Sequence, residues 1–173
     1  ARRVAAACLA AHDQRGAAQV MLEMANRLSA DAPGLAFELL GEACDMDPGN
    51  AEARLTRRKL LKPEESLVEI RKLTLELCDI FCEAGKLDLA LQEARNLKEA
   101  GGLDPAVLAR LARVNHKAGN REEAEQALDQ LAAIFREQAK TGQLIAVLDQ
   151  ITKLNPARRD AARVDAVLAQ FRA

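Results

Sequence analysis

The sequence contains no tryptophan or tyrosine, and aromatic residues make up only 2% of it. Without such side chains, the chain lacks the stacking platforms on which proteins hold single-stranded bases. The formal net charge of −1 also argues against binding that depends on neutralising phosphates. We therefore expect no nucleic-acid partner, and we assign all four phenylalanines to the core: Phe37, Phe81, Phe135 and Phe171.

The sequence also lacks the residues and motifs on which most catalytic sites depend. Serine occurs only at Ser29 and Ser66, histidine only at His12 and His116, and no glycine-rich phosphate loop is present. Neither serine lies in a motif that would activate it as a nucleophile. We therefore predict no catalytic residues, no enzymatic activity and no cofactor. No apolar run is long enough to cross a bilayer, which predicts no membrane span.

The few cysteines raise the question of a metal site. Cys78 and Cys82 are four residues apart, one helical turn, and could be two ligands of a zinc ion. A structural zinc site needs four ligands, and the remaining candidates lie in distant parts of the chain. We therefore expect buried cysteines and no metal. Four cysteines without a dense pattern also indicate a reducing compartment, so we predict a cytoplasmic protein.

Helix-forming residues dominate what is present. The chain is 49% hydrophobic and 29% charged, alanine and leucine are abundant, and no segment alternates between apolar and polar residues. These features predict an all-α fold. From the apolar periodicity and the breakers we expect helices over about 2–11, 15–30, 35–46, 50–61, 63–84, 88–100, 105–118, 120–140, 144–154 and 157–171.

The clearest start and stop signals lie between residues 103 and 131. Asp104 before Pro105 predicts a helix start, because the carboxylate can cap the helix and proline is tolerated in its first turn. Gly119 predicts the end of that helix through a left-handed residue. Asn120 followed by Glu123 resembles a capping box at the start of the next helix. Two amphipathic helices joined by a tight turn follow.

These residues resemble the tetratricopeptide repeat family, in which small and large residues recur at fixed offsets over a helix pair. Two adjacent stretches carry the resemblance: Leu77, Cys78, Phe81, Gly85 and Ala90, and then Leu111, Ala112, Asn115, Gly119 and Ala124. Asn115 departs from the family, which usually has an aromatic residue there. The resemblance implies a right-handed α-α superhelix, here a solenoid of about ten antiparallel helices.

The two ends of the chain repeat each other. A shift of 107 residues places Ala17 on Ala124 and Met21 on Leu128, and a shift of 108 places Leu40 on Leu148. We therefore predict one solenoid, residues 1–173, made of a four-helix unit (1–62), a helix pair (63–102) and a second four-helix unit (103–173). The chain begins with alanine, so we expect it to be a fragment of a longer protein.

The resemblance implies that the first helix of each pair lines a concave groove. The predicted groove residues are Lys72, Asp79, Cys82, Glu83, Arg110, Arg113, His116 and Lys117. The last four make one wall basic, which suits an acidic peptide or helix. We therefore predict a protein-binding module or scaffold. A second basic cluster, at residues 57–62, is assigned to a solvated surface.

Two other functions remain open from the sequence. The chain could be a scaffold that assembles with copies of itself, because its last predicted helix keeps the apolar residues Val164, Val167, Leu168 and Phe171. It could also be a helical repeat that binds single-stranded RNA, one base per repeat. Net charge and the lack of stacking side chains weigh against RNA.

Overall fold

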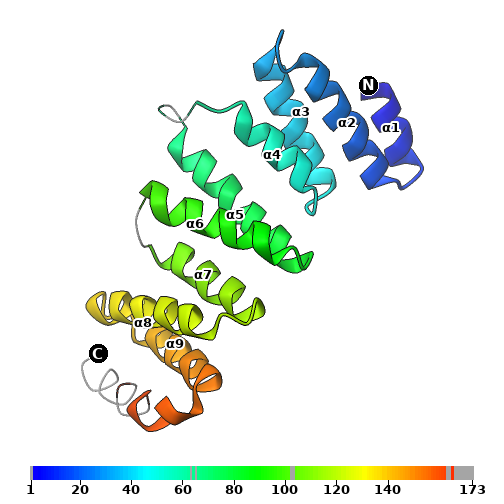
Figure 1. The fold of residues 1–173 in the computed structure, drawn as a ribbon. Helices are drawn as coiled ribbons and strands as arrows, with labels where there is room; N and C mark the ends of the chain where they lie inside the picture. The colour runs from blue at the N-terminus through cyan, green and yellow to red at the C-terminus, as the bar shows by residue number, and fades with distance from the viewer. Residues whose placement is uncertain (1, 63, 65, 102–103, 163–164, 166–173) are drawn as a thin grey trace. The chain divides into compact units, whose positions relative to one another are not determined.

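The computed structural model describes residues 2–62, 64, 66–101, 104–162 and 165, which form helices joined by turns, with no strand among them (Figure 1). The all-α prediction is therefore confirmed. The helices are α1 (Arg2–Ala10), α2 (Gln14–Leu28), α3 (Pro33–Met46), α4 (Ala51–Lys59), α5 (Leu67–Glu83), α6 (Leu87–Gly101), α7 (Pro105–Lys117), α8 (Arg121–Glu137), α9 (Thr141–Leu154) and the 3₁₀ turn η1 (Pro156–Arg158).

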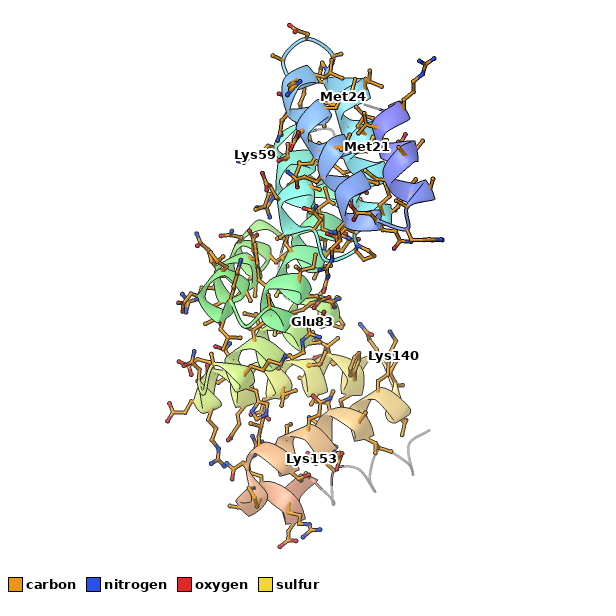
Figure 2. All side chains as sticks on the ribbon, turned by 90° about the vertical axis from the view of Figure 1, so that its right-hand side faces the viewer. Met21, Met24, Lys59, Glu83, Lys140 and Lys153 are labelled. Atoms are coloured by element: carbon orange, nitrogen blue, oxygen red, sulfur yellow. The ribbon has the colours of Figure 1, made fainter. Side chains whose placement is uncertain are left out.

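The chain divides into two compact units, residues 1–84 and residues 85–173. In the first unit each helix packs against the next one along the chain, from α1 through α5. Its buried cluster is rich in alanine, which lets neighbouring helices approach closely. The large members include Met21, Leu22, Leu39 and Leu40, and Met24, labelled beside Met21 in Figure 2, packs against the cluster.

The second unit follows the same packing rule, from α6 through α9 and into η1. Its buried side chains come mainly from α7, α8 and α9. They include Val107, Leu108, Val114, Leu128, Leu131, Phe135, Leu144, Leu148 and Ile151. The three-part division predicted from the sequence, with a helix pair at 63–102, stays a prediction.

The strongest start and stop signals act as predicted. The Asp104 carboxylate accepts a hydrogen bond from the Val107 N–H at 2.9 Å, and the Asn50 amide oxygen accepts one from the Ala53 N–H at 2.9 Å. Each bond satisfies one of the free N–H groups in a first helical turn. Gly85 and Gly119 end their helices with positive φ angles of 72° and 80°. These helix boundaries are confirmed.

The predicted boundaries differ most clearly at three places. The fifth helix begins at Leu67 instead of near residue 63, with Ser66 at its N-cap; Pro63 itself lies outside the described residues. The helix predicted to reach residue 140 ends at Glu137, because Ala139 takes the left-handed conformation (φ 53°). Gly142, predicted to break the chain there, lies inside α9.

The predicted capping box at residue 120 is also wrong. Asn120 is the N-cap of α8, but its side chain makes no capping hydrogen bond. Instead the Asn120 amide nitrogen donates to the side-chain oxygen of Asn115, 3.2 Å away. Asn115 is buried, so this bond explains how an amide is tolerated where the repeat family has an aromatic ring.

The last predicted helix lies largely outside the described residues. Asn155 and Pro156 end α9 and begin η1, as the sequence predicts. Helical residues follow at 159–162. Phe171 and the apolar residues on which the self-assembly hypothesis depends are not among the described residues.

Candidate functional site: the basic face of α7

The predicted groove residues lie on two helices, α5 of the first unit and α7 of the second. On α5, Lys72 and Glu83 are exposed and Asp79 is half-buried; Figure 2 labels Glu83 at the end of the helix. Cys82 is only 1% exposed, so its assignment to the groove wall was wrong. A thiol packs well as a small apolar group, which accounts for this position. The other predicted groove residues on α5, Lys72, Asp79 and Glu83, carry charges of both signs.

Helix α7 is packed on two of its sides. It contacts α6, which precedes it, and α8, which follows it. These contacts bury six of its residues, most of them apolar: Val107, Leu108, Leu111, Ala112, Val114 and Asn115. Because 3.6 residues make one turn, the buried positions leave a single strip of the helix facing solvent.

That strip is basic. Arg113, His116 and Lys117 are exposed and Arg110 is half-buried. The helix contains no acidic residue from Pro105 to Lys117. We call these four side chains the basic face of α7. Arg110, Arg113 and Lys117 are three and four residues apart, so their side chains follow one line along the helix.

Local structure positions the ends of this face. One guanidinium nitrogen of Arg110 (Nη1) donates to the Ala106 carbonyl oxygen at 3.3 Å, one turn earlier. His116 and Lys117 lie in the last turn, where positive charge complements the negative end of the helix dipole. The basic face can therefore present fork-shaped guanidinium groups to carboxylates from a helix that is fixed on both flanks.

The second basic cluster of the sequence, at residues 57–62, is in part structural. The Arg57 guanidinium lies 4.3 Å from the centre of the Phe37 ring, and its Nη2 is 3.3 Å from a carboxylate oxygen of Glu69. Arg58 donates to the Thr74 hydroxyl at 3.0 Å. Both arginines are half-buried, so their assignment to a solvated surface was wrong.

Arg54, which the sequence did not single out, completes this arrangement. It is the most buried arginine of α4, and its Nε is 2.8 Å from a carboxylate oxygen of Glu76 on α5. Its Nη1 also reaches the Asn50 carbonyl oxygen at 3.3 Å. Arg54, Arg57 and Arg58 each contact a residue on α3 or α5. In the sequence, the acidic residues and the threonine of α5 are the signal that could have indicated these contacts. The three arginines hold helices together and do not form a binding face.

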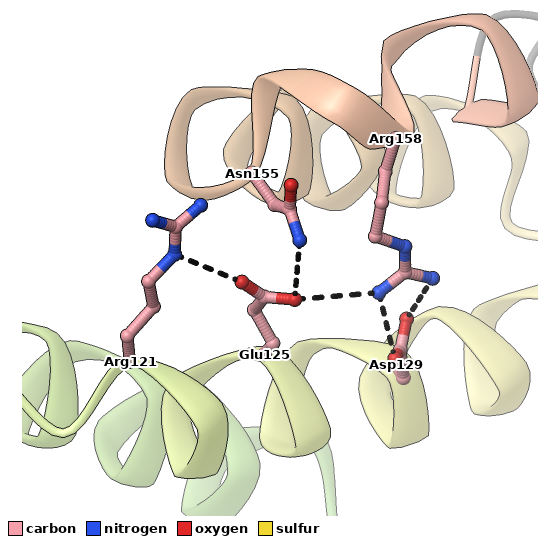
Figure 3. A network of polar contacts seen from close by, with 5 residues as sticks. All are labelled: Arg121, Glu125, Asp129, Asn155 and Arg158. Carbon is pink, nitrogen blue, oxygen red and sulfur yellow. Dashed lines mark hydrogen bonds and ion pairs between the residues drawn. The ribbon is translucent and has the colours of Figure 1, made fainter.

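A third set of charges joins α8 to the end of α9 and η1 (Figure 3). The two terminal guanidinium nitrogens of Arg158, Nη1 and Nη2, donate to the Asp129 carboxylate oxygens, each at 2.9 Å. Glu125 accepts hydrogen bonds from Arg121 and from the Asn155 amide, both at 3.1 Å. Each of these five residues has at least one partner in the network, and all five lie in the second unit, so the network stabilises the unit.

The described residues contain no group of three or more histidine, cysteine, aspartate or glutamate side chains arranged to hold a metal ion. Cys78 and Cys82 are both buried, as core residues are. Of the helices that the structure describes, none combines the length and the apolar character needed to cross a bilayer. The basic face of α7 is therefore the best candidate site in this part of the chain.

Comparison with known proteins adds no family to this description. No model of a known protein family matches the chain, and no curated protein is significantly similar to it. The resemblance to tetratricopeptide repeats therefore stays a prediction that rests on the two motifs beginning at Leu77 and Leu111.

Proposed function

We propose that this chain is a tetratricopeptide-like helical scaffold that binds an acidic segment of another protein, and that the basic face of α7 contacts that segment. One observation carries the proposal. Helix α7 is packed on two sides by α6 and α8, and its remaining strip bears Arg110, Arg113, His116 and Lys117 without one acidic residue. A helix face that bears only basic side chains attracts and orients a ligand of opposite charge.

The packing within each unit supports the solenoid part of the proposal. In both units, the helices contact chiefly their neighbours along the chain. This is the pattern of repeat proteins, in which each repeat rests on the next; a closed bundle would also bring distant helices together. A right-handed superhelix with a concave groove is the arrangement we propose for the whole chain.

The chemistry of the surface favours a carboxylate ligand over RNA. The basic face spans a single helix, and the whole chain has a net charge of −1, so the chain offers no excess of positive charge to neutralise a long polyphosphate. Guanidinium groups bind carboxylates through two parallel hydrogen bonds. A short acidic stretch would fit the one line of cations on α7 without meeting the rest of the surface.

A charge-reversal experiment tests the proposal. The variant carries Arg110→Glu and Arg113→Glu, and the ligand is a fluorescein-labelled peptide of ten glutamates, followed by anisotropy at low salt. We expect saturable binding to the native chain and a loss of at least about tenfold in affinity for the variant, or about 1.4 kcal/mol. Binding should weaken as salt rises, because the interaction is ionic.

The matched control carries Arg95→Glu and Lys98→Glu, two exposed positions on α6 with the same total change of charge. Equal losses in both variants would mean that the peptide senses only net charge, and unchanged binding to the α7 variant would refute the site. Circular dichroism should show the same helicity in all three proteins. A labelled oligouridylate in place of the peptide tests the RNA alternative, and tighter binding of that strand would overturn the proposal.

A further inference from the structure

Helix α3 carries the opposite charge pattern to that of α7. It packs against α2 and α4, and five of its residues are buried. On the side that remains, Glu38 and Asp45 are exposed and Glu42 is half-buried. The helix contains no lysine, arginine or histidine from Pro33 to Met46. We call Glu38, Glu42 and Asp45 the acidic face of α3.

The acidic face of α3 and the basic face of α7 also match in spacing. The three acids lie four and then three residues apart, whereas Arg110, Arg113 and Lys117 lie three and then four residues apart. The two lines are therefore the same when one of them is followed in the opposite chain direction. Each line spans about 10 Å, because a helix rises about 1.5 Å per residue. Two such helices laid antiparallel can bring three carboxylates against three cations.

We propose that the acidic segment bound by the basic face of α7 is helix α3 of a second copy of this chain. The two helices run antiparallel, and the pairs are Glu38 with Lys117, Glu42 with Arg113 and Asp45 with Arg110. Antiparallel helices also place opposite ends of their dipoles side by side. This pairing rests on the proposed function, because it names the partner of the same face.

Other acidic side chains at helical spacing are used inside the molecule. Glu76 on α5 bonds to Arg54, and the two acids of the network in Figure 3 bond to residues at the end of α9 and in η1. A helix that gave up these bonds to bind α7 would lose contacts that stabilise its own unit. Glu38 and Asp45 take part in neither arrangement, which makes α3 the better partner.

The pairing predicts a particular kind of assembly. It joins two different faces, so a pair of copies still presents one α3 and one α7 to further copies, and association continues into chains or closes into a ring. Ion pairs exposed to solvent are individually weak, so we expect association that requires high protein concentration and low salt. It does not involve the last predicted helix, and it therefore differs from the self-assembly considered from the sequence.

Sedimentation velocity over a range of protein concentrations tests the pairing, at about 10 mM and about 150 mM salt. We expect the native chain to self-associate at the lower salt concentration and much less at the higher one. Reversal of one face, by Glu38→Lys with Asp45→Lys or by Arg110→Glu with Arg113→Glu, should weaken self-association at least about tenfold. The chain with all four substitutions has both faces reversed and keeps the native net charge of −1, so it should self-associate again.

The control variant carries Glu23→Lys and Glu137→Lys, two exposed positions on α2 and α8. Its charge changes by the same amount as in the reversal of α3, and it should self-associate as the native chain does. An equal loss in this control would mean that only net charge matters, and it would overturn the pairing. Circular dichroism should show the same helicity in every variant.

The labelled glutamate peptide separates the failure of this pairing from the failure of the proposed function. If the native chain binds the peptide through α7 but does not self-associate, only the pairing is refuted. If it neither binds the peptide nor self-associates, the proposed function is refuted as well. Self-association that neither reversal weakens, or that the fourfold variant does not restore, would belong to another surface and would overturn the pairing.

Discussion

The segments α1–α3 and α7–α9 share the conformation of the first turn and the bounds of the third helix, and they differ in the contacts on one side of the middle helix, α2 or α8. The turn after the first helix passes through a left-handed residue in both, His12 (φ 59°) and Gly119 (φ 80°). The residue that ends the third helix has φ −129° at Asp47 and −132° at Asn155. Helices α3 and α9 begin and end at positions 108 residues apart. These features of the local structure agree with the predicted repetition, which stays a prediction for the segments as wholes.

The difference lies at two positions of the middle helix. In the first segment Ala18 and Leu22 are buried in the apolar cluster, to which α4 contributes Ala53. In the second segment the equivalents are Glu125 and Asp129, which bond to Asn155 and Arg158 (Figure 3). The same pair of helices can therefore be stabilised on this side either by a buried apolar contact or by ion pairs, provided that the buried alanines between the two helices are kept.

The largest predicted change in stability distinguishes the apolar contact of the first segment from the ionic contact of the second. Leu22→Ala should lower the free energy of unfolding by about 3 kcal/mol, because it removes fully buried apolar volume. Asp129→Ala, at the equivalent position, should cost less than about 1 kcal/mol, because its ion pair is exposed to solvent. Urea unfolding followed by circular dichroism measures both, since the chain has no tryptophan to report by fluorescence.

Met21→Ala and Leu128→Ala are the matched controls, one position earlier in each segment. Both side chains are buried, so both substitutions should cost about 2–5 kcal/mol. Similar costs for Leu22→Ala and Asp129→Ala would contradict the comparison, since they would mean that the ionic closure is as strong as the apolar one.

Substitutions at the two left-handed turn residues should change stability by smaller amounts, and the two changes should be opposite in sign. Gly119→Ala should destabilise the second unit by about 1 kcal/mol, because a Cβ is disfavoured at this φ even though nothing lies within 4 Å of it. His12→Gly should stabilise the first unit by less than that, since the unfolded chain gains freedom at the same time. Thermal unfolding resolves both changes.

Gly142→Ala is the control for the turn experiment. Gly142 lies inside α9, and a Cβ there would also meet nothing within 4 Å. Alanine should therefore stabilise α9 by about 0.5–1 kcal/mol through its higher helix propensity. If Gly119→Ala were stabilising as well, the left-handed turn would not be the reason for glycine at position 119.

Much of the fold could be predicted because its signals are local. Asp104, Asn50, Gly85 and Gly119 act on atoms within a few residues, so their effects follow from the sequence alone. Ala139 shows where this fails. An alanine gives no sign that it will adopt φ 53°, and Gly142 nearby offered a better candidate for the break.

The candidate site was predicted in part, for the same reason. The line of cations on α7 follows from helical spacing, and Arg113, His116 and Lys117 are indeed exposed. The roles of Arg57 and Arg58 depend on contacts with α3 and α5, which no local pattern contains. A run of basic residues therefore does not by itself distinguish a solvated surface from an interhelical contact.

The ionic network of the second segment should contribute a modest and salt-dependent stability. A double-mutant cycle of Arg158→Gln and Asp129→Asn should give a coupling energy of about 0.5–1 kcal/mol. The hydrogen bonds that Arg158 donates to the Asp129 carboxylate raise the pKa of Arg158 above its ordinary value, so the arginine stays charged at alkaline pH. The coupling energy should therefore be measured at several salt concentrations, and it should decrease as ionic strength rises.

The exposed pair Lys153 and Asp149 on α9, one turn apart, is the comparison for that cycle. Its coupling should be about 0.3–0.5 kcal/mol, as for other pairs at this spacing. A coupling energy for Arg158 and Asp129 no larger than this would mean that their two parallel hydrogen bonds contribute no additional stability.

The smallest effect concerns Cys44, whose counterpart in the second segment is Thr152. Burial raises the pKa of the Cys44 thiol, and the nearby charges of Arg54 and Arg57 only partly oppose it. The unfolded chain loses this proton near the ordinary pKa of about 8.5, while the folded chain keeps it. Stability should therefore be unaffected below that pH and should decline as pH rises from about 8.5 toward the raised pKa.

Cys44→Ala tests this assignment. The decline in the free energy of unfolding between neutral and alkaline pH should be shallower in the variant than in the native chain, because the variant has no proton to lose at this position. Alkylation gives a second measure: Cys44 should react more slowly than the half-buried Cys8 in the folded protein, and at a similar rate after unfolding. Rapid alkylation of Cys44 in the native state would mean that α4 opens readily, and that the apolar closure of the first segment is weaker than its burial indicates.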